Sequence, residues 1–537
     1  MNRPKSVATL VVSLLILRLI PLDSAADSSQ STWTQHGFDL SNTAYNSFET
    51  EIRASTVGRL KLKWTFPVDE MVPTTPAVVD GIVYVGTWEG ILYALDTKTG
   101  REIWRFNARA LAGDESAWKE RGIGIRGGIT VAGGRVYFGD TAGYLIVCDA
   151  KTGRLIWRKR LEDHPHVRVF SAAKLYEGRI YIGVSSLEES AIRIDPTYNG
   201  YTFRGSVVSL DADTGNEIWR YYTIPKKAEQ IGTKQGGRPV YGPSGAAVWA
   251  TPTLDPARRL VYVATGNGYT GPEEYLMNAE AVIALEMDTG KVRWTHQAEP
   301  GVKDLYTNER LAGDDEGPDL DFGQSPILSG GPNGNQWLAV GQKSGWLYLF
   351  NPETGRKIWE TKVGSGGGLG GLEFGSATDG ERLYVAIAAC EGNVAAVDAS
   401  TGKIQWQTWN GVGASHPPVI IAGPKDDLVV FEGNNRGVLR AYDASDGRVL
   451  WEDRFAKGTS IQGGAVVAEG MVFVGGGFHS ALGGARKGAG NEVRAYALDA
   501  AGPAPDTGHG VRQVADPVRK RARADVADDA PPCAGIQ

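Results

Sequence analysis

Short apolar runs bounded by Gly, Asp and Asn recur along most of this chain, a pattern typical of β-strands separated by tight turns. In the first example, Ile82–Val85 and Leu92–Leu95 flank a turn, and Pro76–Val79 lies just upstream. Runs like Ile82–Val85 return at Val136–Phe138, Ile180–Ile182, Val261–Val263, Trp337–Ala339, Leu383–Val385, Leu428–Val430 and Met471–Phe473. The pattern predicts an all-β protein.

A repeated phrase is superimposed on this pattern. It consists of an acidic or amide residue, then Thr-Gly or Asp-Gly, and a Trp eight positions after the first residue. Its copies are Asp96–Trp104, Asp149–Trp157, Asp211–Trp219, Glu286–Trp294, Asn351–Trp359, Asp398–Trp406 and Asp443–Trp451. The first residue can bond nearby backbone N–H groups to start a turn, and the Gly supplies the positive φ of a tight reversal. Trp64 matches the tail of an eighth copy.

Each unit holds four short strands, which make one blade of a β-propeller, and the repeats predict eight such blades. The last unit has two strands near residues 463–475 and a third at Val493–Tyr496, but it has no fourth strand. Leu60–Trp64 is a fourth strand without a blade. We therefore expect an eight-bladed propeller over residues 60–498, in which the N-terminal strand completes the last blade and leaves no open sheet edge.

The segments outside this ring differ in composition. Residues 1–26 combine a basic start, an apolar run and small residues before the end, which predicts a cleaved secretory signal peptide. Arg18 interrupts the apolar run and argues against a permanent membrane span. Residues 27–59 form an N-terminal segment, and residues 499–537 lack apolar periodicity, as expected for a disordered tail.

Charge and cysteine content narrow the range of partners. A net charge of −6 gives no reason to expect a nucleic-acid partner. Cys148 lies in a repeat strand, where a small buried residue is expected rather than a metal ligand. The sequence contains no Cys-x-x-Cys-His motif and therefore no attachment site for a covalent haem.

The spacing between successive repeat Trp residues is longest between Trp157 and Trp359, and long loops on a rigid scaffold are where sites are found. This sector contains Ser185–Glu189, Trp249, Thr265–Gly268, Asp319–Gly323 and Lys343. Carboxylate and amide oxygens suit a hard cation such as Ca²⁺, a Trp face suits a planar aromatic ligand, and a Lys suits an anionic or carbonyl partner. Structural roles are equally open, because loop carboxylates can be solvated charges, Asn267 can belong to a turn and Trp249 can pack between blades.

Taken in order, these clusters resemble those of the pyrroloquinoline-quinone (PQQ) dependent alcohol dehydrogenases, which are periplasmic eight-bladed propellers with the same Trp-docking repeat. The likeness is greatest to the polyvinyl alcohol dehydrogenase branch and rests on Ser185–Glu189, Gly242–Trp249 and Asp319–Gly323. It spans roughly residues 31–498. The resemblance implies PQQ as cofactor, a bound metal ion for which Ca²⁺ is expected, and a periplasmic location.

By position, the resemblance implies cofactor contacts from Arg126, Ser171, Ser186, Trp249 and Lys343. Trp249 matches the residue on which the quinone stacks, and Arg126 matches an arginine that holds a quinone carboxylate. Lys343 matches a residue that bonds the quinone oxygens, and Ser171 falls where a hydroxyl contacts the cofactor.

The metal ligands and the base follow from the same resemblance. Asn267 matches a metal ligand, and either Glu188 or Glu189 matches the metal-binding glutamate, with the spacing from Ser186 favouring Glu189. In the family, the base is an Asp directly before an aromatic residue, and this criterion selects Asp321, which precedes Phe322. Counting positions back from the following apolar strand at Ile327 selects Asp319 instead. We prefer Asp321 and also count it among the metal ligands. With Asp319 as base, Asp321 would occupy the second-carboxylate position associated with lanthanide use, so a lanthanide stays open.

The resemblance implies oxidation of an alcohol to a ketone, with secondary alcohols and polyvinyl alcohol as candidate substrates. Because the sequence has no haem motif, an external electron acceptor such as cytochrome c is expected. Glu120-Arg121 stands where many relatives place adjacent Cys residues over the quinone. The alternative is a non-enzymatic envelope propeller that acts as an assembly or binding scaffold.

Overall fold

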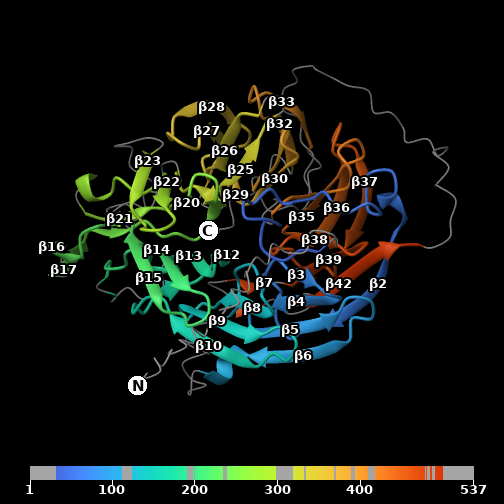
Figure 1. Cartoon of the computed structure of the whole chain (residues 1–537), viewed down its shortest axis with the longest axis horizontal. Coiled ribbons are helices and arrows are strands. Elements are labelled where there is room, and N and C mark those ends of the chain that lie inside the picture. The colour runs from blue at the N-terminus through green and yellow to red at the C-terminus, as the bar shows by residue number, and fades with distance from the viewer. Residues whose placement is uncertain are drawn as a thin grey trace, which may run out of the picture.

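The chain folds into a ring of β-sheets (Figure 1). The computed structural model describes residues 32–111, 124–189, 191, 198, 200–233, 237, 239–271, 273–297, 319–331, 334–367, 370–388, 394–408, 418–477, 479–480, 484–485 and 490–499. Within these residues, eight blades of four antiparallel strands each surround a central axis, with their first strands near the middle and their last strands at the rim, and the sheets of two blades carry a fifth short strand. The prediction of an eight-bladed, all-β propeller is confirmed.

The blades follow one another in chain order. Blades 1 to 4 consist of β3 (Ala77–Val79), β4 (Ile82–Gly86), β5 (Ile91–Asp96) and β6 (Glu102–Asn107); β7 (Thr130–Ala132), β8 (Arg135–Gly139), β9 (Tyr144–Asp149) and β10 (Leu155–Arg160); β12 (Lys174–Tyr176), β13 (Arg179–Ser186), β14 (Ser206–Asp211) and β15 (Glu217–Tyr222); and β19 (Thr253–Asp255), β20 (Leu260–Ala264), β22 (Ala281–Glu286) and β23 (Val292–Gln297).

Blades 5 to 8 have the same order. They consist of β25 (Ile327–Gly330), β26 (Gln336–Gly341), β27 (Trp346–Phe350) and β28 (Lys357–Lys362); β30 (Ser376–Thr378), β31 (Arg382–Ala386), β32 (Val394–Asp398) and β33 (Ile404–Gln407); β34 (Ile420–Ala422), β35 (Val429–Gly433), β36 (Val438–Asp443) and β37 (Val449–Arg454); and β38 (Ala465–Ala468), β39 (Met471–Gly476), β42 (Glu492–Leu498) and β2 (Leu60–Pro67).

Shorter elements lie between the blades or add to them. They are β1 (Tyr45–Asn46), β11 (Val167–Arg168), the pairs β16 (Glu229–Thr233) with β17 (Pro239–Gly242), β18 (Ser244–Gly245) with β21 (Gly268–Thr270), β24 (Gly323–Gln324) with β29 (Glu373–Phe374) and β40 (His479–Ser480) with β41 (Gly484–Ala485), and the 3₁₀ helices η1 (Val57–Arg59), η2 (Ala108–Leu111) and η3 (Glu273–Tyr275).

The ring is closed by its two ends, as the sequence predicts. β2 pairs antiparallel with β42, from Leu60 opposite Leu498 to Pro67 opposite Glu492. β2 is therefore the outermost strand of blade 8, although it precedes blade 1 in the chain. This pairing covers the edge of β42, which would otherwise present unpaired backbone groups to solvent.

The repeated phrase joins each blade to the next. Its Trp indole N–H donates a hydrogen bond to a backbone carbonyl of the following blade: Trp64 to Thr97 (2.8 Å), Trp104 to Ala150 (3.0 Å), Trp157 to Ala212 (3.3 Å), Trp219 to Met287 (2.8 Å), Trp294 to Pro352 (3.0 Å), Trp359 to Ala399 (3.0 Å), Trp406 to Ala444 (3.0 Å) and Trp451 to Leu60 (3.2 Å). The last of these bonds joins blade 7 to β2, the N-terminal strand that completes blade 8.

The Gly of the phrase is needed for two reasons, which Gly153 illustrates. Its φ is +69°, and a Cβ there would lie 2.5 Å from the ring of Trp104 in the preceding blade. The initial Asp closes the turn, because Asp149 Oδ1 accepts hydrogen bonds from Thr152 N (2.8 Å) and from Thr152 Oγ1 (2.7 Å). Turn and docking therefore depend on the same short stretch of sequence.

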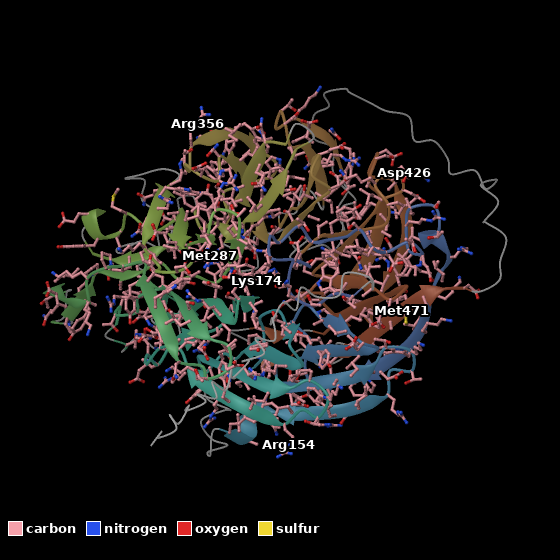
Figure 2. The ribbon with its side chains drawn as sticks, viewed as in Figure 1. Arg154, Lys174, Met287, Arg356, Asp426 and Met471 are labelled. Atoms are coloured by element: carbon pink, nitrogen blue, oxygen red, sulfur yellow. The ribbon has the colours of Figure 1, made fainter. Side chains whose placement is uncertain are left out.

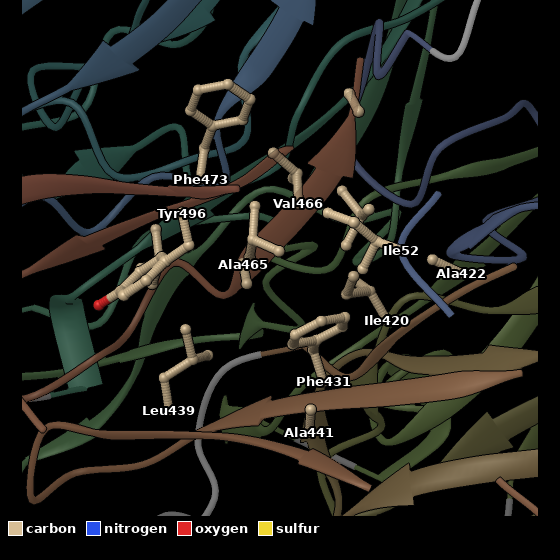
Figure 3. Packing of buried hydrophobic residues seen from close by; sticks show 14 of the residues in the cluster. Ile52, Ile420, Ala422, Phe431, Leu439, Ala441, Ala465, Val466, Phe473 and Tyr496 are labelled. Atoms are coloured by element: carbon tan, nitrogen blue, oxygen red, sulfur yellow. The ribbon is translucent and has the colours of Figure 1, made fainter. Parts of the chain in front are cut away.

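Apolar side chains fill the space between neighbouring blades. Figure 3 shows one such cluster, in which Phe431 and Leu439 of blade 7 lie near Ala465, Phe473 and Tyr496 of blade 8. All five residues are at most 3% exposed. Since fully burying a large apolar side chain contributes about 1.5–3 kcal/mol, these contacts account for much of the cohesion of the ring.

Residues 33–49 were expected only as part of an N-terminal segment, but they form a girdle that bonds to the innermost strand of every blade in turn. The bonds join Trp33 with Val78, Thr34 with Val131, His36 with Lys174, Leu40 with Leu254, Ser41 with Leu328, Thr43 with Thr378, Ala44 with Ile421 and Asn46 with Val467. Figure 2 shows Lys174 near the middle of the ring, whereas Arg154 and Arg356, beside two repeat glycines, lie at the rim.

Some predictions fall outside the described residues. These are the signal peptide at 1–26, the tail beyond Asp499 and the Glu120-Arg121 position. Cys148 is described and is a fully buried free thiol, as predicted. Among the described residues, none of the helices has the length and apolar character needed to cross a bilayer.

Candidate active site

Three of the predicted site residues precede the innermost strands of blades 4 and 5. Trp249 stands just before β19, and Asp319 and Asp321 stand before β25. Residues within the same two strands, Leu254 and Leu328, bond the girdle instead. Since a strand advances about 3.3 Å per residue, the site and the girdle occupy successive levels along the central channel.

Trp249 has a partly exposed ring whose surroundings are closely packed. A Cβ on Gly266 would lie 3.2 Å from its Nε1, and a Cβ on Gly323 would lie 2.9 Å from its Cη2. The Phe374 ring meets it edge-on at a centroid distance of 5.7 Å, and Lys343 Nζ lies 5.6 Å from its centroid. Glycine at 266 and 323 therefore lets two backbone segments approach the indole.

Lys343 holds the two predicted aspartates together. Its Nζ lies 3.2 Å from Asp319 Oδ2, 3.0 Å from Asp321 Oδ2 and 3.9 Å from Glu373 Oε1. Burial by itself would lower the pKa of Lys343, but the charges of Asp321, Asp319 and Glu373 outweigh it and raise that pKa well above its ordinary value. Lys343 is therefore a permanent cation.

Asp321 has an oxygen available for another partner. Its Oδ1 is buried and makes no hydrogen bond of standard geometry within the described residues, although the Asn267 backbone N–H acts on the Asp321 carboxylate, and a Cβ on Gly266 would lie 3.0 Å from Oδ1. Burial raises the pKa of Asp321 above its ordinary value, and Lys343 opposes this shift only in part. Asp319 differs, because its Oδ1 accepts the Asp321 N–H at 3.2 Å.

Arg126 lies among three aromatic rings, one of which is Phe374. Its guanidinium carbon is 4.8 Å from the Phe170 centroid and 6.0 Å from those of Trp88 and Phe374. Burial of the guanidinium lowers the pKa of Arg126, and the charge of Glu373 counteracts this shift. Glu373 thus faces both cations of the site.

The two neighbouring glutamates have different surroundings. The charges of both glutamates act on the buried Tyr269, and the charge of Glu189 also acts on Lys343. Glu188 is fully buried and bonds the segment at 198–203. Burial would raise the pKa of Glu188, but hydrogen bonds from His164, Tyr198 and Thr202 outweigh it and lower that pKa.

The remaining predicted residues are buried and bonded to the scaffold. Asn267 is 2% exposed, and its backbone carbonyl accepts the Ala246 N–H at 2.7 Å. Ser171 Oγ donates to the Ala172 carbonyl (3.1 Å) and accepts the Gly183 N–H (3.2 Å). Ser186 Oγ accepts the Glu188 N–H at 3.1 Å and lies 3.4 Å from the Tyr269 hydroxyl.

Sequence reasoning missed Glu373, Phe374 and Tyr269. Glu373 and Phe374 belong to β29, which pairs in parallel with β24 directly after Asp321 and so brings a distant loop to the site. Phe374 has a φ of +62°, an uncommon value for a bulky residue. The order acidic residue then Phe, shared with Asp321-Phe322, is a signal in the sequence that could have singled out Glu373.

The donor set can be tested for its fit to a cation and a quinone. Among the described residues, no group of three His, Cys, Asp or Glu side chains has the spacing to hold a metal on its own, so an amide such as that of Asn267 would have to contribute. The available Oδ1 of Asp321 and the oxygens of Glu189 and Asn267 are hard ligands. Together with the partly exposed Trp249 ring and the cations Lys343 and Arg126, they fit a planar anionic ligand beside a metal ion.

Comparisons with known proteins point the same way. Residues 33–364 match the PQQ family described as the glucose/ethanol/alcohol dehydrogenase β-propeller domain, and residues 343–524 match the outer membrane protein assembly factor BamB. A polyvinylalcohol dehydrogenase from a Pseudomonas species is 33% identical over 481 residues, which cover 84% of this chain and 74% of that protein.

Solved structures share the fold. The quinohemoprotein alcohol dehydrogenase ADHIIG from Pseudomonas putida HK5 superposes with a TM-score of 0.64 at 21% identity, covering 89% of this chain and 82% of that one. A europium-containing methanol dehydrogenase has a TM-score of 0.63 at 19% identity, covering 87% and 98%. The fold and the family match define a quinoprotein propeller. From the sequence matches, the chain belongs to the PQQ-dependent alcohol dehydrogenases and, within them, to the polyvinyl alcohol dehydrogenase branch.

Proposed function

We propose that this chain oxidises a secondary alcohol, including the hydroxyl groups of polyvinyl alcohol, to a ketone at the Trp249–Asp321–Lys343 site. The observation that carries the proposal is the available buried oxygen of Asp321, which lies beside Trp249 and next to Asn267. When bound, PQQ supplies the acceptor for the hydride that leaves the alcohol carbon, because no side chain of the protein can take two electrons in this way.

The cofactor would be held by residues of several blades. The Trp249 face offers a stacking surface, while Arg126 and Lys343 offer positive charge for carboxylates and quinone oxygens. Ser186 and Ser171 are proposed to support the pocket wall, since both hydroxyls are bonded to neighbouring backbone groups.

The carboxylate of Asp321 would accept the hydroxyl proton of the alcohol. Burial raises the pKa of this group, which makes its carboxylate a stronger base than an exposed aspartate. Lys343, bonded to Oδ2, keeps the carboxylate oriented before the proton arrives. Asp319 is the alternative base, and it contacts the same Lys343 Nζ.

The metal ion would be held by Asn267, Glu189 and Asp321, and Ca²⁺ is our first choice because all these donors are hard oxygens. A lanthanide is the alternative if Asp319 is the base and Asp321 serves only as a ligand. The fold shared with a europium-containing methanol dehydrogenase makes that comparison worthwhile. Glu188, which was the second choice for the metal-binding glutamate, is disfavoured because the protein already supplies its hydrogen-bond donors.

Electrons would leave to a separate acceptor, for which we propose cytochrome c, in the periplasm. This follows from the family and from the lack of a haem-attachment motif in the sequence. The scaffold alternative is supported by the match of residues 343–524 to an assembly factor, but that match omits Trp249 and both aspartates.

The decisive experiment is reconstitution of the purified protein with PQQ and either Ca²⁺ or La³⁺. Dye reduction is then measured with 2-alkanols, polyvinyl alcohol and ethanol. We expect activity with the secondary alcohols, and no dye reduction with any alcohol under either metal would favour the scaffold alternative. Equal or weaker activation by La³⁺ would remove the lanthanide option.

Substitution of the base gives a sharper test. We expect Asp321→Asn to lower kcat by about 10²–10⁴-fold, because the amide cannot accept the proton, while bound quinone still quenches Trp249 fluorescence. Asp319→Asn is the matched control and is expected to retain more activity. Full activity in Asp321→Asn, or the reverse order of the two variants, would transfer the role of base away from Asp321.

A further inference from the structure

A pocket of about 580 Å³, measured to its open mouth, lies between blades 2 and 3, and its described lining residues are all distinct from the predicted site residues. Its walls come from the loop after β10, the segment before β14, the end of β15 and the residues before β16. These connections belong to the sector in which the repeat is most widely spaced, where binding sites are expected. Since pockets of roughly 300–1,000 Å³ hold small organic ligands, this pocket is large enough for a ligand of its own.

One wall of the pocket is formed by Tyr222, the last residue of β15, which is the outermost strand of blade 3. The guanidinium carbon of Arg204 lies 3.8 Å from the centre of the Tyr222 ring, and Arg204 Nη1 donates to the Pro225 carbonyl at 3.2 Å. The Tyr222 hydroxyl donates to Glu162 Oε2 at 3.4 Å. A guanidinium and a carboxylate are therefore held at fixed places on this wall.

The charges that line the pocket balance one another. The lining includes two carboxylates, Glu162 and Asp163, and two basic side chains, Arg204 and Lys227. Carboxylates accept hydrogen bonds, whereas guanidinium and ammonium groups donate them. Because a hydroxyl both donates and accepts, a neutral ligand with several hydroxyls fits this lining better than an ion does. Tyr222 adds apolar surface for the carbon chain of such a ligand.

Direct contacts connect the pocket to the candidate active site. His164 Nε2, on the pocket wall, lies 3.3 Å from Glu188 Oε1. The backbone N–H groups of Thr202 and Phe203, which also line the pocket, donate to the same carboxylate at 2.8 Å. Glu188 comes two residues after Ser186, which the family resemblance places at the cofactor. The pocket and the candidate active site therefore share one stretch of chain, at the end of β13.

We propose that this pocket binds a neutral, hydroxyl-bearing chain, namely a segment of polyvinyl alcohol beyond the alcohol group that is oxidised. The proposal rests on the proposed function and extends it, because it makes the polymer, rather than a small secondary alcohol, the ligand that the protein recognises. Binding away from the reacting group that is equal in the ground and transition states lowers KM without changing kcat. We therefore expect the pocket to lower the KM for the polymer.

The first test measures binding by titration calorimetry of vinyl alcohol oligomers of increasing length into the full chain purified without PQQ. Tyr222→Ala removes the ring beneath Arg204 and should weaken oligomer binding about 3–10-fold. Glu162→Gln removes a charged acceptor and should weaken oligomer binding about 2–10-fold, whereas it would strengthen any binding of inorganic phosphate.

The matched control is Tyr144→Ala in blade 2. Tyr144 begins β9, has the guanidinium carbon of Arg158 at 5.1 Å from its ring centre, and is not among the residues described as lining the pocket. This variant should bind the oligomers as the wild type does. The melting temperature of each variant shows whether the fold is retained.

The second test uses the enzyme reconstituted with PQQ and a metal ion. The KM for polyvinyl alcohol is compared with the KM for a 2-alkanol too short to reach the pocket. We expect the ratio of the two KM values to rise about 3–10-fold in Tyr222→Ala with the same kcat for the polymer, and to stay at its wild-type value in Tyr144→Ala.

The possible outcomes are distinct. Wild-type oligomer affinity and a wild-type KM ratio in Tyr222→Ala would overturn the proposal. Phosphate binding that Tyr222→Ala abolishes, in a wild type that binds no oligomer, would make the pocket an anion site and also overturn it. If the wild type binds oligomers through Tyr222 but oxidises no alcohol, the proposed function fails while the pocket keeps its class of ligand.

Discussion

Burial also shifts the pKa of single residues outside the site, and Asp140 in blade 2 is an example. Its Oδ1 accepts hydrogen bonds from the backbone N–H groups of Ala142 (2.9 Å) and Tyr144 (2.8 Å). Burial raises the pKa of Asp140 to about 7, and these hydrogen bonds offset only part of the shift. Asn434 makes the corresponding turn in blade 7 without a charge, with bonds of 3.0 Å to Arg436 N and Val438 N.

Asp140→Asn is therefore expected to stabilise the protein at neutral pH. Because the folded-state pKa is raised above 3.8, the folded form binds the proton more tightly, and stability falls as the pH rises from about 4 to about 7. The variant should lack this fall and be more stable at pH 8 by roughly 2–4 kcal/mol. Urea unfolding of the wild type and the variant at pH 4 and at pH 8 measures the difference in stability. An equal difference at the two pH values would contradict the expectation.

At the scale of the element, the residues of the repeated turn both form the turn itself and allow the neighbouring blade to pack against it. Asp149, Thr152 and Gly153 form the turn by local bonds, which is why the sequence alone predicts it. The same Gly must also leave room for Trp104 of the preceding blade. Local geometry and blade docking are thus specified by one short phrase, and both were predictable from its repetition.

Two glycine substitutions can separate the cost of the left-handed backbone from the cost of crowding the docked Trp. Gly153 and Gly134 both have positive φ, +69° and +72°, but only at Gly153 would an added Cβ meet a neighbouring atom within 4 Å. Gly134→Ala should cost about 1–2 kcal/mol from backbone strain. Gly153→Ala should cost roughly 1–3 kcal/mol more, because the methyl group displaces Trp104. Denaturant unfolding measures both, and equal losses would mean that the docked ring adjusts freely.

At the scale of the whole molecule, the N-terminal girdle and β2 turn a series of blades into a closed ring. Asn42 shows how the girdle is held, because its Nδ2 reaches Thr253 Oγ1 at 2.7 Å and the Pro252 and Pro326 carbonyls at 3.1 and 3.3 Å. These partners lie at the innermost strands of blades 4 and 5, the same blades that position Trp249 and Asp321.

Asn42→Ala should consequently destabilise the whole ring. The substitution leaves buried carbonyls without a donor and places Ala at a φ of +56°, at a combined cost of about 2–4 kcal/mol. Ser41→Ala is the control, because Ser41 contributes its main-chain carbonyl to Leu328 and keeps it in the variant. Differential scanning calorimetry compares the two, and an Asn42→Ala variant as stable as Ser41→Ala would show that the girdle is not essential.

Much of the architecture was determined by the sequence itself. Eight blades, the strand order and closure by residues 60–64 follow from a periodic pattern, because each turn and each docked Trp depends on residues within one repeat. The candidate site residues were found through family resemblance, since the site departs from the repeat and periodicity carries no information there.

Only the tertiary structure decided which of these residues meet. Lys343 bonds both Asp319 and Asp321, Glu373 reaches the site through pairing of β24 with β29, and Glu188 bonds the backbone at Thr202 and Phe203. The girdle was likewise invisible in the sequence, because its bonds join residues up to hundreds of positions apart and most of them use main-chain atoms, which every residue carries. Long-range contacts of this kind depend on the closed ring, which brings distant loops to one axis.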